Sequence, residues 1–312
     1  MRLQSISSAA PTCRPSPGLP CAAGDPPRVV LAVAALGYQV PQADFTGRVH
    51  SVFAQACNLA SGDTLFTLVP PHAGNGPTTL RLAVGAPHDL RELFDVGEPF
   101  SCRQRRLRTG HTELRLQDAG VWRPTVASSQ LAPAQIDSRL RCAAALLARR
   151  HSARMSVIER EAATLVAELG GACRALDIDV AVRSAEALIG WGEGLTPAGD
   201  DFLVGLLAGL GALVQADEWR HGFRAALGAA IARGTARTTP IAAHYLRLAA
   251  GGHFTEALVD ARDGLLCEPD QAWVDAALGR ALAVGATSGA DTVSGLLAGL
   301  CAWLPLARAE TS

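Results

Sequence analysis

One hexapeptide, Gly-Leu-Leu-Ala-Gly-Leu, occurs twice in the chain, at residues 205–210 and again at 295–300. An aspartate, Asp201 or Asp291, stands four residues before each copy. Each copy lies in a segment that is apolar on every side of a helix, so both helices are expected to be buried at the centre of one domain. Glycines four residues apart let two helices pack closely. We therefore predict two central helices side by side, whose first turns bring Asp201 and Asp291 to a common pocket.

The spacing of apolar residues changes part-way along the chain. Between residues 28 and 126, short runs such as 79–84 and 111–116 alternate apolar with polar residues, which is typical of strands. From residue 134 onward apolar residues recur every three or four positions, which is typical of helices, and no β-α-β alternation appears. The pattern predicts an α+β fold. An antiparallel β-rich domain or small barrel at 28–126 precedes a helical domain at 134–312, and residues 1–27 form a disordered leader.

The charged residues exclude several classes of function. The 28 basic residues nearly balance the 29 acidic ones, so the chain has no general attraction to nucleic acid or to an anionic membrane. All of the basic residues are arginine, and a chain without lysine cannot form a pyridoxal phosphate Schiff base or carry biotin.

The 8 cysteines are scattered singly, which favours buried thiols in a reducing compartment. We expect a cytoplasmic protein.

Residues 190–201 hold the richest set of candidate functional groups. Four glycines, which allow a ligand to approach the backbone closely, alternate with three carboxylates just before the first apolar helix. Such carboxylates repel one another unless a proton, an arginine or a cation such as Mg²⁺ lies between them. Asp200 and Glu193 are therefore predicted as catalytic residues and as magnesium ligands. Asp201, which is repeated as Asp291, is predicted to cap the helix. Capping alone, with no ligand, is the alternative for this loop. The other predicted ligand contacts here are Gly192, Gly194, Thr196 and Gly199.

A second candidate element follows at residues 237–247. Thr238 is expected to cap a helix that Pro240 enters near its first turn. His244 and Arg247 then lie three residues apart on one face, where they could act as a general base or an anion clamp. A hydrogen-bonded core histidine beside a surface arginine is the equal alternative. A separate basic run, at residues 103–108, is expected to be a solvated hairpin or else to face an acidic partner.

Three motifs together carry a resemblance to a known family. They are residues 192–201, Arg237-Thr238-Thr239, and residues 287–292 with the glycine-bearing helix that follows. In these motifs the chain resembles a bacterial family long catalogued as a domain of unknown function, which includes a subunit of the oxamate carbamoyltransferase of anaerobic allantoin degradation. The resemblance covers about residues 180–302. It implies a role in moving a carbamoyl group between phosphate and an amide such as oxamate, beside other subunits.

This resemblance extends the set of expected ligand contacts. Carbamoyl phosphate and oxamate are small anions, and paired helix N-termini with nearby arginines suit them. Two alternatives stay open because the sequence shows no obvious nucleophile. One is a non-catalytic ligand-binding or scaffold subunit of a multi-subunit complex, and the other is a magnesium-dependent hydrolase. The added ligand contacts are Arg237, Thr238, Thr239, Ser288, Gly289 and Asp291.

Overall fold

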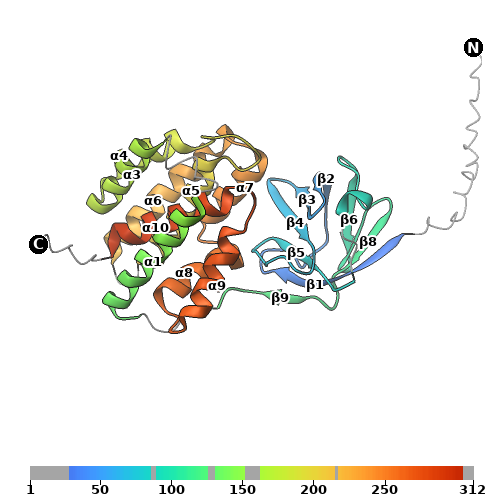
Figure 1. Cartoon of the computed structure of the whole chain (residues 1–312). Helices are drawn as coiled ribbons and strands as arrows, with labels where there is room; N and C mark the ends of the chain where they lie inside the picture. The colour runs from blue at the N-terminus through green and yellow to red at the C-terminus, as the bar shows by residue number, and fades with distance from the viewer. Residues whose placement is uncertain (1–27, 86–88, 126–130, 152–161, 215–216, 305–312) are drawn as a thin grey trace, which may run out of the picture.

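The structure is a computed structural model in which a strand-rich domain is followed by a helical domain (Figure 1). The α+β prediction, with a small barrel ahead of the helices, is confirmed. The predicted leader, residues 1–27, lies outside the described residues. The described residues are 28–85, 89–125, 131–151, 162–214 and 217–304.

The strands of the described residues form one sheet that closes into a barrel. The order is β5-β4-β3-β2-β6-β7-β8-β1, and β1 closes the ring by pairing with β8 over its first half and with β5 over its second. β9 adds beside the end of β1. The strands are β1 (Val29–Gly37), β2 (Phe45–Phe53), β3 (Ala56–Ser61), β4 (Thr64–Val69), β5 (Thr79–Leu82), β6 (Pro99–Arg103), β7 (Arg106–Arg108), β8 (Thr112–Arg115) and β9 (Gly120–Trp122).

The barrel differs from the expectation in the direction of some strands. β1 runs parallel to β8 and β9, and β4 runs parallel to β5, whereas the prediction was antiparallel throughout. Alternation along a strand shows which residues face inward but not which way the neighbouring strand runs. The alternation does identify the residues of the barrel core. The fully buried ones include Leu80, Leu82, Leu107 and Leu114.

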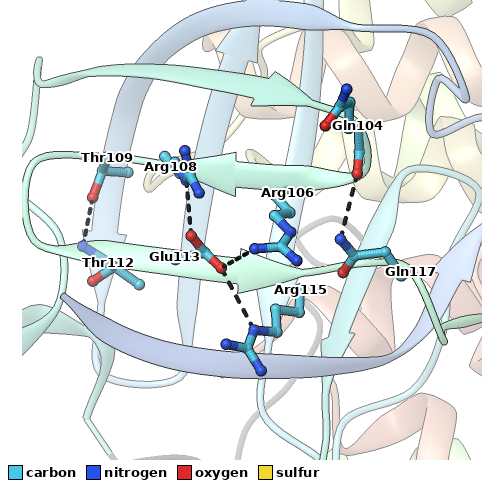
Figure 2. Close-up of polar contacts among 8 residues, drawn as sticks. All are labelled: Gln104, Arg106, Arg108, Thr109, Thr112, Glu113, Arg115 and Gln117. Carbon is cyan, nitrogen blue, oxygen red and sulfur yellow. Dashed lines mark hydrogen bonds and ion pairs between the residues drawn. The ribbon is translucent and has the colours of Figure 1, made fainter.

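The basic run forms a hairpin on the outer face of the barrel (Figure 2). Arg106 and Arg108 on β7 and Arg115 on β8 surround the buried carboxylate of Glu113, at nitrogen–oxygen distances of 3.7, 2.8 and 3.5 Å. Hydrogen bonding from Arg108 is the main cause that lowers the pKa of Glu113. The hairpin prediction is thus confirmed, and binding of an acidic partner by these arginines stays a prediction.

Helices form the rest of the described chain, and none of those described has the length and apolar character needed to cross a membrane. An aspartate or threonine side chain caps the start of α4, α6, α7 and α9. The described helices are α1 (Pro133–His151), α3 (Ala163–Ala175), α4 (Ile178–Leu188), α5 (Ala198–Gly211), α6 (Glu218–Gly234), α7 (Pro240–Ala250), α8 (Glu256–Leu266), α9 (Gln271–Leu282) and α10 (Ser288–Trp303).

The two glycine-bearing helices, α5 and α10, pack against each other through the middle of the helical domain (Figure 1). A Cβ atom at Gly205 would lie 2.7 Å from the backbone nitrogen of Leu296, and one at Gly295 would lie 2.9 Å from that of Leu206. The contacts are reciprocal and in register, so the helices run parallel and are related by an approximate two-fold axis. Only glycine allows backbones to approach this closely. The predicted pair of central helices is confirmed.

The cysteines fit the expectation only in part. Cys57, Cys102 and Cys173 are buried, and each has a free thiol. Cys142 is exposed on α1, which corrects the expectation that these thiols are buried. The reason is its place on the outward face of an amphipathic helix, between the buried Leu140 and Ala143.

Candidate functional site

The loop before α5 is shaped by glycines with left-handed backbone angles. Gly190 and Gly192 have φ angles of +74° and +105°, and a Cβ atom at Gly192 would lie 2.9 Å from the backbone nitrogen of Ala198. A residue with a side chain would be strained at either position. The turn brings the carbonyl of Trp191 to the backbone N–H of Gly199, with an N···O distance of 2.9 Å. The loop is therefore locked onto the start of α5.

Asp200 holds this loop in place instead of facing a ligand. It is only 1% exposed, and its carboxylate accepts a hydrogen bond of 3.0 Å from the Gly190 N–H. The Thr238 hydroxyl donates a second, short hydrogen bond to the same carboxylate. Burial is the main cause that raises the pKa of Asp200, and these two hydrogen bonds oppose it. Asp200 thus joins the loop before α5 to the segment before α7.

Asp201 does not cap α5, which corrects the sequence prediction. The helix begins at Ala198, three residues before Asp201, and neither its cap residue Pro197 nor the cap Thr287 of α10 makes a side-chain capping bond. The first-turn N–H groups are instead bonded to backbone carbonyls, such as that of Pro197. Asp201 is therefore not at the cap position, and the catalytic role of Asp200 stays a prediction. Asp201 and Asp291 occupy equivalent positions in α5 and α10, and neither position is the cap.

The first turns of α5 and α10 meet, as the repeat predicted. The hydroxyls of Thr196 and Ser288 are hydrogen-bonded to each other at 2.7 Å, and both lie within hydrogen-bonding reach of the carboxyl of Asp201. Asp291, which is fully buried on α10, lies near enough for its charge to act on Asp201. Loss of hydration is the main cause that raises the pKa of Asp201 to about 8, and the charges of Asp291 and Asp200 add to it. Burial and the neighbouring carboxylates therefore favour the protonated form of the Asp201 carboxyl.

A pocket of about 340 Å³ opens beside Asp201, between the barrel and the helical domain. Its wall is mostly apolar, with hydroxyl, amide, imidazole and carboxyl groups set into it, and none of the described residues that line it is an arginine. Such a pocket suits a small neutral or weakly charged ligand held by a few hydrogen bonds. The barrel contributes Phe53, Ala56, Asn58, Thr67 and Pro77, and the helical domain contributes Leu195, Thr196, Asp201, Val204, Ile241, Tyr245, Leu248, His253, Phe254, Thr255, Leu258, Val284, Gly285, Ser288 and Thr292.

Several predicted ligand contacts lie outside this pocket. Thr239, and not Thr238, caps α7: its hydroxyl accepts a 3.1 Å hydrogen bond from the Ala242 N–H. Arg237 donates to the backbone carbonyl of Glu186. The backbone N–H of Gly289 is bonded to the Val284 carbonyl. These residues therefore shape the loops around the site, whereas Thr196 and Ser288 line it.

His244 joins the two domains, as the core-histidine alternative expected. It is 4% exposed, and its Nδ1 accepts a 3.3 Å hydrogen bond from the Leu65 N–H on β4. Its Nε2 lies 3.0 Å from the Thr78 hydroxyl. Burial, aided by the charge of Arg247, lowers the pKa of His244 to about 4, so the ring is neutral at neutral pH. Both ring nitrogens are occupied by protein groups, and His244 does not line the pocket. The geometry favours the core-histidine alternative, and a role of His244 as a general base stays a prediction.

The predicted magnesium ligands are not assembled with a third ligand. Glu193 is exposed in the loop, and the Asp200 carboxylate is engaged by Gly190 and Thr238. Within the described ranges, no group of three or more His, Cys, Asp or Glu side chains is arranged to hold a metal ion. Binding of a divalent cation stays a prediction.

Two pocket residues carry polar groups that the sequence did not single out. Tyr245 forms a hydrogen bond with Thr67 across the domain boundary, and burial raises the pKa of its phenol. His253 contacts Tyr38, which is 215 positions away in the chain, at 2.8 Å between Nδ1 and the phenol oxygen. Contacts over such separations leave no local pattern. The available signals were the place of Tyr245 beside His244 in the same candidate element and that of His253 at the glycine-rich end of the helix that follows.

Comparison with protein-family models supports the resemblance seen in the sequence. Residues 188–300 match the oxamate carbamoyltransferase subunit AllH, and residues 30–121 match the AllH family N-terminal domain. The chain belongs to the AllH family. Both domains of the structure are thus AllH domains, and the pocket lies where the two matched regions meet. Searches of curated proteins and of solved structures gave no match.

Proposed function

We propose that this chain is a subunit of a carbamoyl-transfer enzyme of the oxamate carbamoyltransferase type and that the pocket between its domains holds the small amide substrate. The observation that carries the proposal is the convergence of α5 and α10 on one pocket, at hydroxyl groups of the AllH-matched region. Carbamoyl phosphate and oxamate are the substrates of this proposed reaction, which requires the other subunits and takes place in the cytoplasm.

The groups around Asp201 support binding of an amide. A protonated carboxyl donates a hydrogen bond to a carbonyl or carboxylate oxygen, and the hydroxyls of Thr196 and Ser288 fix its orientation. The Oδ2 atom of Asp201 is buried and has no hydrogen-bond partner among the described residues. The N-terminal ends of α5 and α10 carry partial positive charge. This charge favours a carboxylate or carbonyl oxygen of the ligand at the same place.

A non-catalytic ligand-binding subunit is the second candidate. The observation in its favour is the pocket wall, in which no described residue is an arginine that could clamp the phosphate of carbamoyl phosphate. In this case the chain would hold the amide for a partner subunit that binds the phosphate. Both candidates place the amide in the same pocket.

Reconstitution tests the proposed function. The purified chain, the partner subunits and their mixture are each incubated with carbamoyl phosphate and oxamate, and oxalurate and phosphate are measured. We expect turnover only in the mixture, because the chain requires its partners. Partner subunits that make oxalurate at the full rate without this chain would contradict the proposal.

A further inference from the structure

His253 is fixed at the edge of the pocket from two sides. Its backbone N–H donates a 2.9 Å hydrogen bond to the Leu248 carbonyl at the end of α7, where Gly252 turns the chain with a φ angle of +81°. Its ring nitrogen Nδ1 lies 2.8 Å from the phenol oxygen of Tyr38, which follows β1 in the barrel. The two rings meet edge to face, with centroids 5.7 Å apart. One domain supplies the imidazole and the other supplies its orienting partner.

The second ring nitrogen is available to a ligand. Because Tyr38 engages Nδ1, the nitrogen left over is Nε2, and no hydrogen bond joins Nε2 to any described residue. His253 is also the one histidine among the described residues that line the pocket. An imidazole that lines a cavity, with one nitrogen held by a protein group and the other without a protein partner, suits a general base.

We propose that His253 is the general base of the pocket and that Tyr38 positions it by accepting a hydrogen bond from Nδ1–H. This inference rests on the proposed function. The amide nitrogen of the acceptor forms a bond to the carbamoyl carbon and gives its proton to Nε2. The bond between that carbon and the phosphate oxygen breaks, and phosphate leaves with the electron pair. The proton on Nε2 then passes to the departing phosphate, which restores the neutral ring.

Burial and a neighbouring arginine favour the neutral form of this base. Burial, followed by the charge of Arg224, lowers the pKa of His253 below its ordinary value. Arg224 is held in place by hydrogen bonds to the carbonyls of Ala249 and Ala250 at the end of α7. Burial raises the pKa of Tyr38 and outweighs the opposing charge of Arg123, which lies over the ring at 5.4 Å, so the phenol keeps its proton. The ring of His253 is therefore neutral at neutral pH and free to accept a proton.

The test uses the assembled complex with carbamoyl phosphate and oxamate as substrates. We expect His253→Gln to lower kcat by about 100-fold or more with little change in KM, because a general base acts in the transition state. Tyr38→Phe is expected to lower kcat by about 10-fold through loss of orientation. The control is His72→Gln, which changes an exposed histidine outside the pocket and should leave the rate unchanged.

The pH profile separates this role from a structural one. The wild-type rate should fall in acid as His253 is protonated, and this acidic limb should be absent in His253→Gln. A His253→Gln complex with the wild-type rate and limb would overturn the inference while leaving the proposed function intact. A wild-type complex without turnover would overturn both.

A second measurement does not depend on the activity or stability of the variants. Imidazole ¹⁵N spectra of the wild-type chain at neutral pH should show a protonated Nδ1 and an unprotonated Nε2 for His253. The reverse assignment would overturn the role of His253 as a base at Nε2.

Discussion

Replacing Gly205 by alanine is expected to destabilise the helical domain by about 3 kcal/mol or more. The new Cβ atom would lie 2.7 Å from the backbone nitrogen of Leu296 and still closer to the carbonyl oxygen of Thr292. Both are backbone atoms, so neither can rotate away, and α5 and α10 would have to separate along their length. The measurement is the free energy of unfolding from urea denaturation.

The control for this change is a glycine in an open part of a helix. A Cβ atom at Gly222 on α6 would meet no atom within 4 Å. Gly222→Ala should therefore stabilise the chain by about 0.5–1 kcal/mol, because alanine has the higher helix propensity. If Gly205→Ala unfolds at the same urea concentration as the wild type, the close packing of the two helices is wrong.

Replacing His244 by alanine is expected to cost about 2–4 kcal/mol of stability at neutral pH. The change removes a buried ring and leaves the Leu65 N–H and the Thr78 hydroxyl without their partner at the domain boundary. The exposed His221 on α6 provides the control, and His221→Ala should change stability by less than about 0.5 kcal/mol. Thermal and urea unfolding of the three proteins give the comparison.

The cost of losing His244 should shrink in acid. Its pKa is about 4 in the folded chain, below the ordinary value of 6.5, so the unfolded chain binds more protons between these values. His244 therefore makes the folded state less stable as pH falls from about 6.5 to about 4, by about 3 kcal/mol in all. The alanine variant lacks this penalty. A difference in stability between wild type and variant that stays constant from pH 7 to pH 4 would contradict the burial of a neutral His244.

The sequence predicted those features that have a local or repeated pattern. Alternating residues placed the barrel interior, and the duplicated hexapeptide placed α5 and α10 side by side with Thr196 and Ser288 at one pocket. The prediction from the repeat was correct because its glycines allow close contact between the backbones of the two helices.

The errors came from contacts that the sequence does not encode locally. Asp201 appeared to be a cap because the position of a helix start depends on which loop carbonyls reach the first N–H groups, such as that of Trp191 to Gly199. The sequence also left the core-histidine alternative undecided for His244, because the barrel residues that contact both its nitrogens lie more than 160 positions away. The pairing of Tyr38 with His253 was missed for the same reason.

The most direct test of the central claim asks where the substrate binds. Protein NMR shifts are followed while the purified chain is titrated with oxamate and, separately, with carbamoyl phosphate. Ala56→Trp places a large ring in the pocket from the barrel side, and Val84→Trp places the same ring at a position that is 95% exposed and outside the pocket. We expect oxamate to shift the resonances of Tyr245, Ser288 and Thr292 in the wild type and in Val84→Trp but not in Ala56→Trp. Equal binding to all three proteins, with no shift at these residues, would contradict the claim that the pocket between the domains holds the substrate.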